Sequence, residues 1–126
     1  MLNDVDPKSF EHIYIASGYT DLRRGIDGLS AIVENTLKLY PYDRCLFLFC
    51  GRRNDRIKGL LWEGDGFLLL YKRLETGKFK WPRTPAEARE LSPREFAELM
   101  DGMRPDKTQG IPKVYPASIK NALKSV

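Results

Sequence analysis

Cysteine and histidine are scarce in this sequence of 126 residues, which holds two cysteines and one histidine. Cys45 and Cys50 lie five residues apart on one apolar run, so on a strand they point to opposite faces and could not bond to each other. Together with the lone His12 they offer no set of ligands for a metal. We therefore expect no metal, no other cofactor, and two buried thiols in a reducing compartment, the cytoplasm.

Long apolar runs are also absent, since none approaches the roughly 20 residues that cross a bilayer. We expect no membrane contact, and the acidic N-terminus lacks the apolar region of a signal peptide. The length suits a single domain with a sizeable core. We place that domain at residues 1–103 and expect residues 104–126, which are polar and contain three prolines, to form a flexible tail.

Acidic residues are scarce in one stretch, residues 44–83. This stretch holds ten basic side chains and four acidic ones, a net charge of +6, whereas the whole chain carries +4. Residues 1–43 carry −3 and residues 84–126 carry +1. Concentrated charge of one sign is repulsive unless a counter-charge arrives, so the local excess predicts a polyanionic partner.

The hydrophobic pattern predicts an α+β fold: an antiparallel β-sheet of four to five strands with helices packed on one face, a C-terminal helix and an extended tail. A first helix of about 12–18 residues should begin at Thr20, and two more at Thr84-Pro85 and at Ser92. Glu95, three residues after Ser92, completes a capping box for the last helix. The strands are expected at residues 12–16, 45–50, 56–62, 67–74 and 78–81.

If Asp65-Gly66 and Thr76-Gly77 are two-residue turns, the register of two hairpins follows. Lys58, Arg73 and Lys80 then form a row of like charges across three strands, which destabilises a sheet unless phosphates lie across it. Arg56, Trp62 and Tyr71 share that face, and the two aromatic side chains are placed to stack bases. The alternative is a solvated sheet face whose aromatic side chains lie under another element.

Further arginines lie in the predicted turns. Arg23 and Arg24 fall in the first turn of the first helix, where free N–H groups and arginines make an anion site; alternatively they pair with Asp21 or Asp27. Arg52 and Arg53 lie in a turn between strands, where side chains project freely. The candidate nucleic-acid-binding residues are Arg23, Arg24, Arg52, Arg53, Arg56, Lys58, Trp62, Tyr71, Arg73 and Lys80.

No pattern of residues points to catalysis. Asp21, Asp27, Asp43 and Asp65 lie in turns or at helix starts, where aspartate is a common structural choice. Two-metal hydrolysis of DNA would need carboxylates gathered on one scaffold, and the sequence contains neither a Walker loop nor a nucleophile elbow. We therefore expect no catalytic residues and a protein that is not an enzyme.

Three strings of residues, 20–29, 46–58 and 62–82, together resemble one family. It is the TnpB-type accessory protein, the product of the second reading frame of insertion sequence 66 elements, and the likeness covers about residues 13–102. The resemblance implies a bacterial mobile-element protein that assists a separate transposase and has no established chemistry of its own.

Charge and resemblance together predict a non-catalytic accessory protein that assists the transposase. It should bind DNA, namely the ends of the element, through a basic β-sheet and hairpin surface. Two alternatives stay open: a protein adaptor that docks on the transposase without touching DNA, and an RNA-binding regulator of the element's expression. A steep dependence of affinity on salt would separate phosphate binding from a mainly apolar protein interface.

Overall fold

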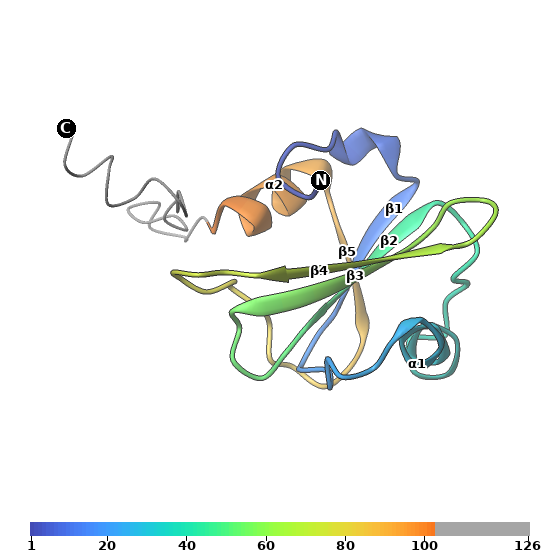
Figure 1. Ribbon diagram of the computed structural model, residues 1–126, viewed down its shortest axis with the longest axis horizontal. Coiled ribbons are helices and arrows are strands. Elements are labelled where there is room, and N and C mark those ends of the chain that lie inside the picture. Colours follow the sequence, from blue (N-terminus) through green and yellow to red (C-terminus); the bar gives the residue numbers. More distant parts are fainter. Residues whose placement is uncertain (103–126) are drawn as a thin grey trace.

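A five-stranded sheet forms the centre of the protein, with strand order β4-β3-β2-β1-β5 (Figure 1). The computed structural model describes residues 1–102, so the predicted tail over 104–126 lies outside the described residues. The predicted α+β class, a sheet of four to five strands and the C-terminal helix are confirmed. The strands are β1 (His12–Ala16), β2 (Cys45–Cys50), β3 (Arg56–Trp62), β4 (Phe67–Arg73) and β5 (Ala88–Leu91).

The sheet is mixed rather than wholly antiparallel as predicted. β1 runs parallel to β2, with His12 opposite Cys45, while the other three pairs are antiparallel. Parallel neighbours need a crossover connection. Here that connection carries α1 (Ile26–Ala31), which continues directly as a π-helical segment, η2 (Ile32–Thr36).

The first helix begins later than predicted, because residues 20–24 form other hydrogen bonds. The N–H of Thr20 donates to the carbonyl of Cys50 at 2.8 Å, and the Asp21 carboxylate accepts the N–H of Arg23 at 3.0 Å in a local turn. Gly25 is the N-cap of α1. Arg23 and Arg24 therefore precede the helix, and their predicted placement in its first turn is wrong.

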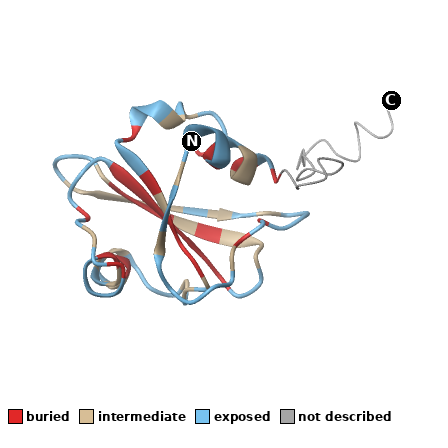
Figure 2. Ribbon diagram, turned by 180° about the vertical axis from the view of Figure 1, so that it is seen from behind, coloured by how far each residue is buried: buried red, intermediate tan, exposed pale blue. Residues whose placement is uncertain are grey.

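Each face of the sheet has its own core, and β2, whose sequence is apolar throughout, is buried at every position (Figure 2). One core packs α1 and η2, through Leu29 and Val33, against Phe47. The other packs Phe96 of α2 (Pro93–Asp101) against Leu48. The two helices thus cover opposite faces, and the prediction that they share one face is wrong.

Residues 78–81 form no strand, contrary to the prediction. Phe79 and Trp81 are buried in the core beneath α2, the Phe79 N–H donates to the carbonyl of Asn54 at 2.7 Å, and the Trp81 indole N–H donates to Ala16 at 2.9 Å. The chain then continues to β5 rather than forming the helix predicted at residue 84. β5 pairs antiparallel with β1, whose backbone groups on that edge would otherwise be unpaired.

The last helix begins as predicted. Ser92 and Glu95 form both hydrogen bonds of the capping box, and Gly102 ends the helix with φ of 71°. Among the described residues, no helix is long and apolar enough to cross a membrane.

Candidate nucleic-acid interface

The β3–β4 hairpin has a register two residues away from the predicted one. Arg56 lies opposite Arg73, Lys58 opposite Tyr71, and Trp62 opposite Phe67. The loop spans residues 63–66 rather than two residues, because the Glu63 N–H donates to the carbonyl of Gly66 at 2.9 Å. A shift of two residues keeps each side chain on its predicted face, so Arg56, Lys58, Tyr71 and Arg73 still share one face.

The predicted row of Lys58, Arg73 and Lys80 is wrong, since Lys80 belongs to no strand. The structure instead gathers six of the ten candidate residues around one open pocket of about 800 Å³, here called the basic pocket. It lies where the turn after β1, the β2–β3 turn and the β3–β4 hairpin meet. Its lining consists of Tyr19, Thr20, Asp21, Leu22, Arg23, Gly51, Arg52, Arg53, Arg56, Lys58, Leu69 and Tyr71.

Arg83 holds two walls of the basic pocket together. Its guanidinium donates to the carbonyls of Gly18 at 2.7 Å, Gly51 at 2.8 Å and Arg52 at 3.3 Å. The backbone bond from Thr20 to Cys50 joins the same two segments. An arginine fork suits this task because its rigid, planar donors reach several acceptors at once. The loops of the pocket are therefore fixed by hydrogen bonds rather than by helix or strand geometry.

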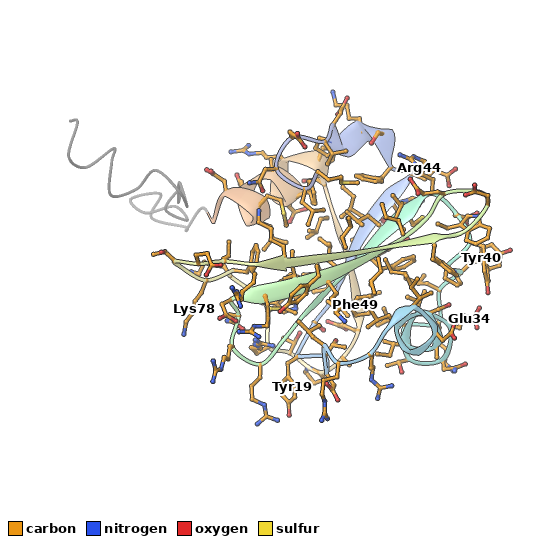
Figure 3. All side chains as sticks on the ribbon, viewed as in Figure 1. Tyr19, Glu34, Tyr40, Arg44, Phe49 and Lys78 are labelled. Carbon is orange, nitrogen blue, oxygen red and sulfur yellow. The ribbon has the colours of Figure 1, made fainter. Side chains whose placement is uncertain are left out.

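Tyr19 is a pocket residue that the sequence does not predict. The residue is 58% exposed, and its side chain lies at the lower edge of the molecule in Figure 3. The Arg52 guanidinium stacks 4.5 Å from the ring centroid and donates to the Tyr19 hydroxyl at 3.0 Å. No sequence signal links the two residues, because they are 33 positions apart and belong to separate loops.

The charge of the basic pocket is only partly neutralised. Arg23 pairs with Asp21 at 2.8 Å, the pairing weighed as an alternative above, and its hydrogen bonds lower the pKa of Asp21. Arg56 pairs with Asp55 at 3.1 Å.

Three further cations of the pocket, Arg52, Arg53 and Lys58, have no acidic side chain within ion-pair distance among residues 1–102. The Lys58 ammonium donates to the carbonyl of Arg24 at 2.9 Å and lies 5.8 Å from the ring centroid of Tyr71. The pocket thus presents a net excess of positive charge beside two exposed aromatic rings, those of Tyr19 and Tyr71.

Four predicted residues do not line the pocket. Arg24 contributes only its carbonyl, to Lys58, and Arg73, opposite Arg56, pairs with Glu75 at 2.9 Å. Lys80 is exposed in the irregular segment after β4. Trp62 lies at the far end of β3.

Trp62 belongs to a second surface feature, here called the aromatic cluster: Tyr40, Tyr42, Trp62 and Phe67. Its rings contact one another with centroids 4.9–5.4 Å apart. Tyr40 is 62% exposed and Tyr42 is 40% exposed. Trp62 is therefore packed among aromatic side chains, not presented beside the basic pocket.

Cys45 and Cys50 are free, buried thiols on opposite faces of the sheet, as predicted. Burial raises the pKa of both, that of Cys50 to about 11, so neither is primed as a nucleophile. In the part of the chain that the structure describes, no three His, Cys, Asp or Glu side chains are grouped to hold a metal ion.

Comparison with known proteins adds the family. The family described as IS66 Orf2 like protein matches residues 11–110. The chain belongs to this family. The resemblance inferred from the three strings of residues is confirmed, and the IS66 Orf2-like proteins are accessory proteins of transposition rather than known catalysts.

Two rhizobial proteins are similar to this IS66 Orf2-like protein. The uncharacterized protein y4jC of Sinorhizobium fredii (strain NBRC 101917 / NGR234) is 34% identical over 115 residues, covering 91% of this chain and 98% of y4jC. The uncharacterized protein y4hO of the same strain is 38% identical over 91 residues, covering 72% of this chain and 79% of y4hO. No solved structure matches the chain significantly.

Proposed function

We propose that this IS66 Orf2-like protein binds DNA in the basic pocket and assists the separate transposase of its element without chemistry of its own. One observation carries the proposal: three cations, Arg52, Arg53 and Lys58, line one pocket with no acid paired to them among the described residues. Phosphates are the counter-charges that such an arrangement recruits, because each contact releases condensed counterions from the nucleic acid.

The aromatic rings of the pocket support a nucleic-acid ligand over a simple anion. Tyr19 and Tyr71 are 58% and 55% exposed, and each has a cation against its ring. Bases stack on exposed aromatic side chains without regard to sequence. A backbone held by the arginines would leave its bases within reach of these rings, which suits unpaired nucleotides or a distorted end of a duplex.

The decisive experiment is a mobility-shift titration with element-end DNA, random DNA and RNA, each at two salt concentrations. We expect the affinity to fall steeply with salt. Replacing Arg52 and Arg53 with alanine should weaken binding to all sequences alike and reduce the log–log salt slope by up to about two units. The matched control replaces Arg89 and Arg94 with alanine. These two exposed arginines lie on β5 and α2, outside the pocket, and their replacement should leave the salt slope unchanged.

An equal loss in both double variants would show a general charge effect and contradict a site in the basic pocket. Tighter binding to RNA than to either DNA would replace the proposal with the RNA-binding regulator. No binding to any nucleic acid at low salt would leave the adaptor as the function.

A second candidate function, docking on the transposase, is favoured by the aromatic cluster. Exposed tyrosine and tryptophan side chains are enriched at the centres of protein interfaces, and Tyr40 and Tyr42 lie at the surface next to Trp62. Replacing Tyr40 and Tyr42 with serine should abolish co-purification of the transposase of the same element while leaving the DNA titration unchanged. Retained co-purification would contradict this site.

A further inference from the structure

Among the residues that the structure describes, the outer edge of β4 is unpaired. β4 is the last strand of the sheet, and in residues 1–102 no other strand pairs with its outer side. It has seven residues, and none of them is glycine or proline. Soluble proteins normally protect such an edge, because its free backbone groups pair with any strand that arrives.

The backbone groups that point outward follow from the printed register. Two hydrogen bonds flank the hairpin in that register, from the Glu63 N–H to Gly66 and from the Leu74 N–H to Asp55. In an antiparallel pair, hydrogen-bonded and non-hydrogen-bonded positions alternate. Leu68, Leu70 and Lys72 therefore bond to β3, and the free N–H and C=O groups belong to Phe67, Leu69, Tyr71 and Arg73.

The side chains along this edge are mainly apolar and incompletely covered. Leu68 and Leu70 are only partly buried against one core, and Phe67 and Leu69 only partly against the other. Charge is the usual protection of an edge, but here it is confined to the last two residues of the strand. The Lys72 ammonium donates a hydrogen bond to the Asn3 side chain. The charge of Lys72 therefore lies over the face of the sheet and not at its edge.

We propose that β4 pairs with β4 of a second copy of this chain, antiparallel and centred on Leu70. This register is the one in which all four outward-pointing residues pair with one another: Phe67 with Arg73 and Leu69 with Tyr71, each twice. Since every residue supplies one N–H and one C=O, eight main-chain hydrogen bonds form across the two-fold axis.

The side chains fit the same register. Arg73 lies opposite Phe67 of the second copy and Leu69 opposite Tyr71, so each cross-strand pair is a favourable type. On the other face Lys72 lies opposite Leu68, and the two copies of Leu70 meet. No two like charges oppose each other. This self-complementarity favours a second copy of the chain over an unrelated strand.

The pairing would join two sheets into one. Leu69 of one copy would lie opposite Tyr71 of the other on the same face of the sheet, and both residues line the basic pocket. Both basic pockets would therefore lie on one face of the joined sheet. Self-pairing depends on the edge of β4 alone and does not require that the basic pocket binds nucleic acid.

The test measures self-association of the full chain by sedimentation equilibrium, with two variants of one residue. Leu69→Ala and Leu69→Pro lose the same leucine side chain, but only proline removes the outward N–H, and edge strands tolerate proline at such positions. Two symmetry-related bonds are lost, so we expect Leu69→Pro to raise the dimer dissociation constant about tenfold over Leu69→Ala. A dimer equally stable in both variants would overturn the proposal.

Amide hydrogen exchange of the unaltered protein, resolved by NMR at low and high concentration, gives a second readout that does not depend on a variant folding. The amides of Phe67, Leu69, Tyr71 and Arg73 should exchange several-fold more slowly at high concentration, while those of Leu68, Leu70 and Lys72 serve as internal controls. A chain that stays monomeric, or one whose β4 edge gains protection only when the transposase is added, would overturn self-pairing.

Discussion

Arg56 lies directly opposite Arg73 across β3 and β4, at the margin of the basic pocket. The alternation of hydrogen bonds makes this a non-hydrogen-bonded pair, the type in which opposed side chains approach most closely. Each guanidinium has one acidic neighbour, Asp55 at 3.1 Å and Glu75 at 2.9 Å. Each of these two like charges is thus partly neutralised by its own local ion pair. An anion bound between the two guanidinium groups would further relieve their repulsion.

The first prediction concerns this pair. Replacing Glu75 with glutamine should lower the free energy of unfolding at low salt, because both opposed arginines remain and one counter-charge is removed. The loss should shrink at high salt, where exposed charges are screened. Chemical denaturation at two salt concentrations measures both effects. Arg73→Gln is the matched control and should lower the free energy of unfolding less, since it removes the repulsion from Arg56 together with the ion pair to Glu75. A loss for Arg73→Gln as large as that for Glu75→Gln would contradict this account.

The second prediction concerns Arg83 as a positioning residue. Arg83→Lys keeps the charge but loses the fork that bonds to Gly18, Gly51 and Arg52. We expect a loss of about 1–2 kcal/mol in the free energy of unfolding, because a backbone carbonyl in a part-buried loop loses its donor. Circular dichroism melts and denaturant titrations measure it.

The same variant should weaken DNA binding without changing its salt slope, since no phosphate contact is removed but the two loops lose their fixed spacing. A reduced slope at unchanged stability would instead make Arg83 a direct phosphate ligand.

The third prediction concerns the cap of α2. The Glu95 carboxylate accepts hydrogen bonds from Ser92, foremost from its backbone N–H, and these lower the Glu95 pKa below the ordinary value of 4.5. A carboxyl whose pKa falls on folding adds stability above its unfolded pKa, and that stability is lost as the pH falls through the folded value. The stability difference between the unaltered protein and Glu95→Gln should therefore be present at pH 7 and shrink toward pH 3.

Ser92→Ala provides the companion measurement for the cap. It should cost about 1 kcal/mol at pH 7, the usual effect of losing an N-cap. Because Phe96 of the same helix is buried in the core, the loss should appear in the global transition. A difference for Glu95→Gln that stayed constant between pH 7 and pH 3 would mean that the carboxylate does not act through its charge.

The fourth prediction is that the purified protein does not cut, nick or join DNA with magnesium or manganese. Two-metal hydrolysis needs carboxylates that share cations about 4 Å apart. Asp21 lies in the basic pocket beside Arg23 and Arg56, whereas Asp65 lies in the loop beyond the opposite end of β3. Seven strand residues span about 20 Å, so these two aspartates do not meet. Metal-dependent cleavage that disappears in Asp21→Asn or Asp65→Asn would contradict the prediction.

Local patterns determined a large part of this protein. The capping box at Ser92 and Glu95, the fully buried β2, and the placement of Cys45 and Cys50 on opposite faces all follow from rules that act within a few residues. The sharing of one face by Arg56, Lys58, Tyr71 and Arg73 was also correct, although the predicted register was two residues off. Side chains alternate with a period of two, so an even shift moves partners but not faces.

Only the tertiary structure decided which distant segments meet. The parallel pairing of β1 with β2 and the use of residues 88–91 as β5 depend on which edges of the sheet are free after the chain has collapsed. The basic pocket likewise depends on Arg52 stacking on Tyr19 and on Arg83 joining two loops, contacts between residues 31–65 positions apart. Such contacts leave no periodic trace in the sequence. The Arg83 bonds are accepted by backbone carbonyls, which any residue supplies, and the contact between Arg52 and Tyr19 joins residues 33 positions apart.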